Sequence, residues 1–146
     1  MFPEYLIPYI AYIVALVVCG VAIWKGDPPL KLAAGVLIVG WALTPIFMGR
    51  DRHVLDYPIT IIDTNTALIL VWISMRWRRV WCAVLAALTI LIVLIPFVHL
   101  CDPGIHLYNR YAANNIVSHF QLVVIAMATW LVVRDRGRAG EGVLQS

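Results

Sequence analysis

The chain has 146 residues, of which 62% are hydrophobic and only 13% are charged, and its mean hydropathy is +0.87. A water-soluble domain of this length needs more polar surface, so the composition excludes one and indicates an integral membrane protein. The net charge of +3 is not a signature of nucleic-acid binding, because the basic residues stand in short flanks such as "RWRR" and "RDRGR" beside apolar runs, where membrane proteins keep them.

Apolar runs of about 20 residues are long enough to cross a hydrocarbon core about 30 Å thick. Five such runs follow one another and predict an all-α bundle of five transmembrane helices, which occupies residues 1–133 as a single domain embedded in the lipid bilayer. The predicted spans cover residues 5–24, 30–48, 58–75, 80–100 and 115–133.

The sequence begins "MFPEY", which places an acidic residue and no basic one before the first apolar run. A cleaved signal peptide has a basic segment before its apolar run, so we interpret this span as a permanent helix. Ala11, Ala15 and Cys19 recur at four-residue spacing along it. Such a stripe lets another helix approach closely, either within the protein's own bundle, which we prefer, or in a partner protein.

The connection "WKGDPPLK" predicts a tight turn in which Asp27 caps the second helix and Pro28 takes its first position. The third run opens with the polar stretch "TIIDTNT", continues as "ALILVWISM" and stops at "RWRR". We expect it to cross the membrane. The alternative is a bundle of four spans in which residues 58–75 lie in the membrane interface.

Residues 104–113 predict a short interfacial helix with one apolar and one polar face. Asn114 or Asn115 is the expected cap of the fifth span. The glycine-rich and polar stretch from Arg134 onward predicts a flexible tail over residues 134–146.

Lys and Arg predict the orientation, since they concentrate on the cytoplasmic side of membrane proteins. With five spans, one side carries eight of them and the other three, which places the N-terminus outside and the C-terminus in the cytoplasm. The eight are Lys25, Lys31, Arg76, Arg78, Arg79, Arg134, Arg136 and Arg138, and the three are Arg50, Arg52 and Arg110. The four-span alternative gives the same split and turns residues 101–114 inward.

Under five spans a cluster of polar residues lies on the outer side, and its candidate site members are Asp63, Asn65, His99, Asp102 and His119. Asp63 and His119 each enter a span by a short distance. A carboxylate at that depth is costly in lipid, so we expect both side chains to face the bundle interior and to contact one another. The pair either handles protons or a ligand, or is a structural hydrogen bond that fixes helix register.

The histidines and cysteines lack the spacing of a metal site, since no HxxxH, HExxH or CxxC occurs. Neither a nucleophile elbow, a phosphate loop nor a pair of carboxylates at helical spacing occurs within a span. We therefore predict no catalytic residue, no metal and no cofactor.

Three stretches, "WKGDPPLKLAAG", "IIDTNTALILVWISMRWRRVW" and "VHLCDPG", resemble small uncharacterised integral membrane proteins of bacteria, some of them encoded near prophage genes. The resemblance covers most of the chain as an apolar pattern. It implies a location in the bacterial inner membrane, and it implies no activity or functional residue.

These observations favour a non-enzymatic membrane protein that acts through protein contacts, as an accessory subunit or modulator of a membrane complex. Its expected partner is another membrane protein or a second copy of the chain, and not a nucleic acid. The alternative is a transporter-, channel- or holin-like protein that uses an outer polar cavity around Asp63 and His119.

Overall fold

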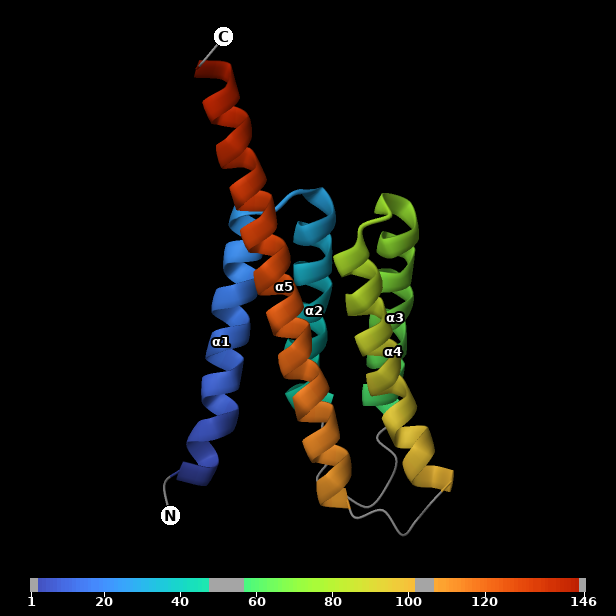
Figure 1. Cartoon of the computed structure of the whole chain (residues 1–146). Coiled ribbons are helices and arrows are strands. Elements are labelled where there is room, and N and C mark those ends of the chain that lie inside the picture. The colour runs from blue at the N-terminus through green and yellow to red at the C-terminus, as the bar shows by residue number, and fades with distance from the viewer. Residues whose placement is uncertain (1–2, 48–56, 102–106, 145–146) are drawn as a thin grey trace.

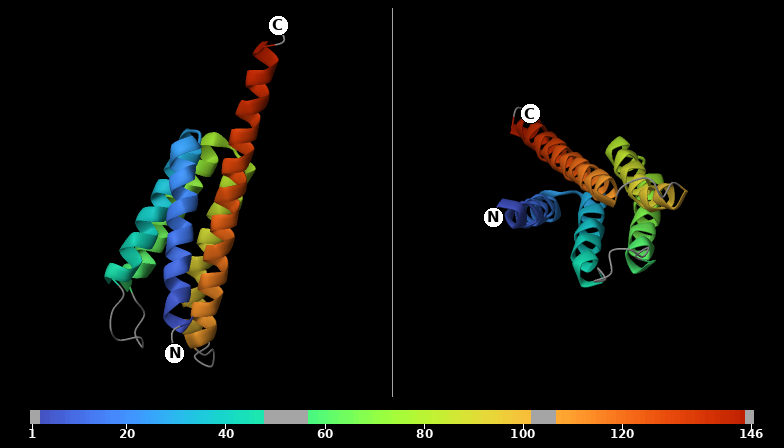
Figure 2. Two further views of the ribbon diagram at one scale, coloured as in Figure 1. Left: turned by 90° about the vertical axis from the view of Figure 1, so that its left-hand side faces the viewer. Right: turned by 90° about the horizontal axis from the view of Figure 1, so that it is seen from below.

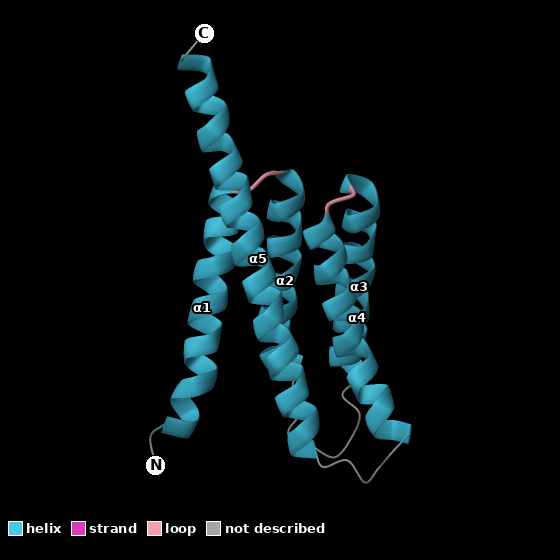
Figure 3. Ribbon diagram, viewed as in Figure 1, coloured by secondary structure: helices cyan, strands magenta, loops and turns pink. Residues whose placement is uncertain are grey.

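The structure is a computed structural model that describes residues 3–47, 57–101 and 107–144, and within these ranges it contains helices and no strand (Figures 1 and 3). The all-helical fold class is thus confirmed. The helices are α1 (Pro3–Lys25), α2 (Pro28–Phe47), α3 (Tyr57–Trp77), α4 (Val80–Cys101) and α5 (Leu107–Leu144).

The turn between α1 and α2 follows from its residues. Gly26 donates its backbone N–H to the Ala22 carbonyl at 2.8 Å, and a Cβ at Gly26 would collide with that same oxygen, so only glycine fits. Asp27 precedes α2 and its carbonyl accepts the Lys31 N–H at 3.0 Å, which is the predicted cap position. Its carboxylate, however, pairs with Arg79 at 3.7 Å instead of capping the helix.

The turn between α3 and α4 depends on Arg78, whose φ of 49° lies in the left-handed region. Its N–H bonds to the Ser74 carbonyl at 2.9 Å. Helices commonly end on one left-handed residue, usually glycine, because it turns the chain away from the axis. A residue other than glycine in the left-handed conformation destabilises the fold by about 1 kcal/mol. At Arg78 this conformation lets the chain turn directly from α3 into α4, which begins at Val80.

The five helices run alternately up and down and form a ring (Figures 1 and 2). Each helix packs against the next one in the chain, and α5 packs against both α4 and α1, which closes the ring. The two short turns lie at the end of the bundle that carries Lys25 and Arg79, called the basic end below (Figure 1).

The centre of the bundle contains small and medium apolar residues from all five helices, among them Cys19, Ala33, Leu70, Leu85 and Ile125, each less than 2% exposed. The buried residues also include polar ones: Thr66, Thr89, Ser118, Gln121 and Thr129.

The outer surface is apolar by contrast. Large hydrophobic side chains are exposed on every helix, as shown by Ile13 (60%), Val39 (55%), Leu68 (62%), Leu94 (50%) and Phe120 (57%). A surface of this kind is stable against lipid and not against water.

Three described segments are long and apolar enough to cross a membrane, namely Tyr57–Trp77, Val80–Val98 and Ala112–Ala139. The described apolar parts of α1 and α2, Ile10–Lys25 and Pro28–Thr44, are shorter. The chain is therefore a membrane-embedded helical bundle with three helices that meet the length of a span. The third run, residues 58–75, is one of them.

The α5 helix differs from the prediction at both ends. It begins at Leu107 and runs without a break to Leu144, so a separate interfacial helix over 107–113 and a cap at Asn114 or Asn115 are wrong; residues 104–106 lie outside the described ranges. The tail predicted as flexible is helical as far as Leu144. Extending an existing helix costs little per residue once it has been nucleated, so three glycines do not end it.

Candidate functional site

The structure describes the side chains of three of the five residues in the predicted outer cluster. Asp63 on α3 is half-buried, whereas Asn65 and His119 are exposed. His99 lies near the end of α4, but its side chain, like all of Asp102, falls outside what the structure describes. The cluster therefore has three members whose surroundings are known.

The predicted contact between Asp63 and His119 is wrong. His119 is exposed, and its Nδ1 lies 2.6 Å from the carbonyl oxygen of Asn115 on its own helix. Moreover, α3 and α5 are not neighbours in the ring. Neighbours of His119 in sequence face inward instead, since Ser118 and Gln121 are buried. Successive helix residues differ by about 100° around the axis, so Ser118 and His119 cannot face the same way.

The interior polar contact between α4 and α5 is made by different residues. Gln121 is 1% exposed, and its Nε2 donates to Oγ1 of Thr89 at 2.8 Å. The Thr89 hydroxyl in turn donates to the Leu85 carbonyl at 2.8 Å. Oε1 of Gln121 is buried and accepts no hydrogen bond from the residues that the structure describes. This pair joins two neighbouring helices in the middle of the bundle.

Sequence reasoning missed this pair. Thr89 stands alone in "AALTILIVL" and carries no signal of its own. Gln121, however, interrupts the apolar run of α5, and an amide in a membrane span is costly unless it faces other protein groups. That argument alone would have placed Gln121 inside the bundle.

Three other threonine hydroxyls within the described helices bond to their own backbone. Thr44 donates to Gly40, Thr64 to Thr60 and Thr129 to Ile125, at distances of 2.7–2.9 Å. Such bonds satisfy the hydroxyl where it sits. These groups therefore give no donor to a ligand.

The stripe of small residues on α1 faces the bundle. Ala15 is 5% exposed and Cys19 1%, while Ala11 is partly buried. Ala15 and Cys19 belong to the central apolar cluster together with residues of the other four helices. The stripe thus serves packing inside the protein, which is the interpretation that we prefer, and it is not free to bind a partner.

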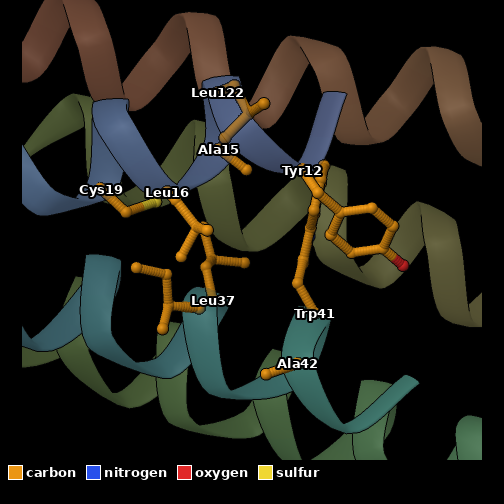
Figure 4. A pocket seen from close by; sticks show the side chains of 9 residues that line it. Tyr12, Ala15, Leu16, Cys19, Leu37, Trp41, Ala42 and Leu122 are labelled. Carbon is orange, nitrogen blue, oxygen red and sulfur yellow. The ribbon is translucent and has the colours of Figure 1, made fainter. Parts of the chain in front are cut away.

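An apolar pocket of about 180 Å³ lies between α1 and α2 (Figure 4). Its upper boundary in that view is Leu122 of α5, and the ring of Tyr12 meets that of Trp41 edge-on at 5.9 Å. The lining residues are Tyr12, Ala15, Leu16, Cys19, Leu37, Ile38, Trp41, Ala42 and Leu122. No charged side chain lines the pocket, so it suits hydrocarbon.

The basic end is tied together by arginines. Arg136 of α5 donates to the carbonyl oxygens of Lys25 at 2.8 Å and Gly26 at 3.2 Å. Arg79 reaches Asp27 at 3.7 Å, with 57% and 19% of the two side chains exposed. An ion pair this open to solvent contributes little to stability, so its main effect is to position the two turns.

Tryptophans accompany the cations at this end. The guanidinium of Arg134 lies 4.9 Å from the ring centre of Trp130, that of Arg76 lies 5.8 Å from Trp77, and Lys25 similarly covers Trp24. Tryptophan and basic residues together are typical of the boundary between hydrocarbon and the lipid headgroups.

Comparison with protein-family models, with curated proteins and with solved structures finds no match. Within the described residues, no three His, Cys, Asp or Glu side chains are grouped closely enough to hold a metal ion. The function must therefore be argued from the surfaces and contacts described above.

Proposed function

We propose that this chain is a non-enzymatic integral membrane protein that acts through protein contacts, as an accessory subunit or modulator of a membrane complex. The observation that carries the proposal is the projecting end of α5. Arg136 contacts the turn between α1 and α2, so residues 137–144 extend past the bundle by about 12 Å at 1.5 Å per residue (Figure 1).

This extension is helical, and the side chains described at its base, residues 134–139, are all exposed. Arg136 anchors its base, so its direction is held relative to the spans. A segment that is already helical where it leaves the membrane is a suitable contact for a partner, because less conformational entropy is lost on binding than for an unfolded segment.

We further propose that all five helices cross the bacterial inner membrane, with the N-terminus outside and the C-terminus in the cytoplasm. The support is that α1 and α2 have 23 and 20 residues, about 30 Å or more in length, and expose apolar side chains as the other helices do. The basic end carries cations from α1, α3 and α5, and such an end faces the cytoplasm by the positive-inside rule.

Affinity purification of the full chain in several mild detergents tests the protein-contact proposal. We expect a second membrane protein, or a second copy of the chain, at fixed stoichiometry. The matched variant ends after Arg136, so it keeps the contacts of Arg136 with the α1–α2 turn and lacks the projecting helix; it should lose a partner that binds there and keep one that binds between spans. A lone monomer under every condition would contradict the proposal.

A reporter inserted within residues 102–106 tests the five-span topology, since this stretch connects α4 to α5. An external signal supports five spans, and an internal one supports four. A reporter after Gln145 should be cytoplasmic in both arrangements and serves as the control.

The second proposal, a transporter-, channel- or holin-like protein, has lost the Asp63–His119 pair on which it was based. One observation still favours it: the buried and unpaired Oε1 of Gln121, which is an acceptor available to water or a permeating solute. Induced expression that leaves the membrane potential and ion fluxes unchanged would contradict this class.

A further inference from the structure

Asn65 stands out on the outer face of α3. The side chains around it on that face are apolar and strongly exposed, as for Ile61 (60%), Leu68 (62%) and Trp72 (57%), and Asn65 is exposed among them. It lies about 12 Å from the start of α3 and about 18 Å from its end, at 1.5 Å per residue. Its carboxamide is therefore at a depth where the surroundings of a spanning helix are hydrocarbon.

The carboxamide of Asn65 is only partly satisfied. Nδ2 donates one hydrogen to the Ile61 carbonyl at 2.9 Å. A primary amide has a second N–H and an acceptor oxygen with two lone pairs, and these find no partner in the described part of the chain. Lipid tails offer none either, and an unsatisfied polar group is costly in the bilayer core.

The outer faces of the other helices provide a comparison. The exposed residues of α4 from Val80 to Val98 are all apolar. On α5 the exposed polar residues Asn115 and His119 lie about 5 and 11 Å past Ala112, where the apolar segment of that helix begins, and His119 bonds to its own backbone. Residues spaced alternately by three and four occur on every outer face and do not distinguish α3. The exposed amide of Asn65 at mid-depth is what distinguishes α3.

We propose that a second copy of this chain packs against the outer face of α3 and that the two Asn65 side chains hydrogen-bond to one another. Copies inserted in the same direction are related by a two-fold axis along the membrane normal, so their α3 helices run parallel and each Asn65 meets its counterpart at equal depth. Each amide then donates its free N–H to the other's Oδ1.

The second copy is the occupant that this geometry selects, because it presents an amide at the required depth by symmetry. The flanking residues Ile61, Leu68, Trp72 and Met75 supply the apolar remainder of the contact, at the spacing that parallel helices use to interdigitate. A single amide in such a seam sets register and the number of strands. This inference specifies the partner in the proposed function and rests on the membrane embedding of α3.

The test uses the full chain labelled separately with donor and acceptor fluorophores and reconstituted in liposomes over a range of protein-to-lipid ratios. We expect energy transfer that follows a monomer–dimer equilibrium. Asn65→Leu, which keeps the size and removes the amide, should weaken association about five- to thirtyfold, the range of one to two interhelical hydrogen bonds. Asn65→Gln should restore most of it.

Cross-linking locates the interface independently. In a Cys101→Ser background, where the remaining cysteines are buried, Leu68→Cys on α3 should form a disulfide dimer on mild oxidation. The matched variant Leu91→Cys on the exposed face of α4 should not. The inference is overturned if transfer does not depend on concentration, if Asn65→Leu associates as tightly as the parent, or if Leu91→Cys cross-links and Leu68→Cys does not.

These outcomes separate the inference from the proposed function. A chain that remains monomeric in liposomes but co-purifies with another membrane protein overturns the α3 dimer and leaves the protein-contact proposal standing. A dimer that Asn65→Leu disrupts supports the inference, even where no further protein co-purifies.

Discussion

The Thr89–Gln121 contact makes an asymmetric prediction about stability. Thr89→Val keeps the shape of the side chain and removes its hydroxyl. Gln121 would then be left 1% exposed with neither its Nε2 donor nor its Oε1 acceptor paired. A buried polar group that loses its partner costs about 1–3 kcal/mol, so Thr89→Val should lower the free energy of unfolding by about that amount.

The reverse change should cost far less. In Gln121→Met the Thr89 hydroxyl keeps its own acceptor, the Leu85 carbonyl at 2.8 Å. The buried, unpaired Oε1 disappears as well, so we expect a change of less than about 1 kcal/mol in either direction. The double variant Thr89→Val/Gln121→Met should resemble Gln121→Met alone, since the group left unpaired by the first change is no longer present.

Reversible unfolding in mixed detergent micelles measures all three variants. The control is Thr129→Val: Thr129 is also buried, but its hydroxyl bonds only to Ile125 on its own helix at 2.7 Å. We expect Thr129→Val to be much milder than Thr89→Val. The reasoning is refuted if the two threonine variants are equally destabilised, or if Gln121→Met is as harmful as Thr89→Val.

Three further predictions follow from single positions. Gly26→Ala should destabilise the protein by about 1–3 kcal/mol because its new methyl group would collide with a backbone oxygen, whereas Gly20→Ala, which meets nothing within 4 Å, should unfold at or above the parent's temperature; equal effects would contradict this. Under five spans, a membrane-impermeant maleimide added to intact cells should label the exposed Cys101 and spare the buried Cys19, and labelling of Cys101 only after lysis would argue for the four-span arrangement. His119→Ala should change stability by less than about 0.5 kcal/mol, because the ring is exposed and bonds only to its own helix; a larger loss in a thermal unfolding assay would show that it has an interior partner.

The positions of the first four helices were readable from the sequence, because in a membrane protein they are set by the length of the apolar runs and by the turns between them. The predicted spans 30–48 and 80–100 correspond closely to α2 (Pro28–Phe47) and α4 (Val80–Cys101). The tight turn at Asp27 also lies where proline and glycine predicted it. Both features depend on residues close together in the chain.

Which way each side chain faces was decided only by the tertiary structure. In a soluble helix, the apolar stripe marks the buried face, but in a membrane helix lipid and protein interior are both apolar, so the pattern carries little information about the face. The sequence placed Asp63 and His119 at similar depth and led us to expect both side chains in the bundle interior, but His119 is exposed. Packing of α5 against α4 and α1 turned Gln121 inward and His119 outward.

The continuation of α5 was likewise a tertiary outcome. Three glycines after Arg136 indicated a flexible tail, since glycine weakens an isolated helix by about 1 kcal/mol per residue. In the folded chain this segment continues a helix that is already formed. Arg136 fixes the base of the segment at the end of α1 by donating to the carbonyl oxygens of Lys25 and Gly26. Composition determined that this chain belongs in a membrane and where its first four helices lie, whereas contacts between residues 32 to 111 positions apart decided which of its polar groups face one another.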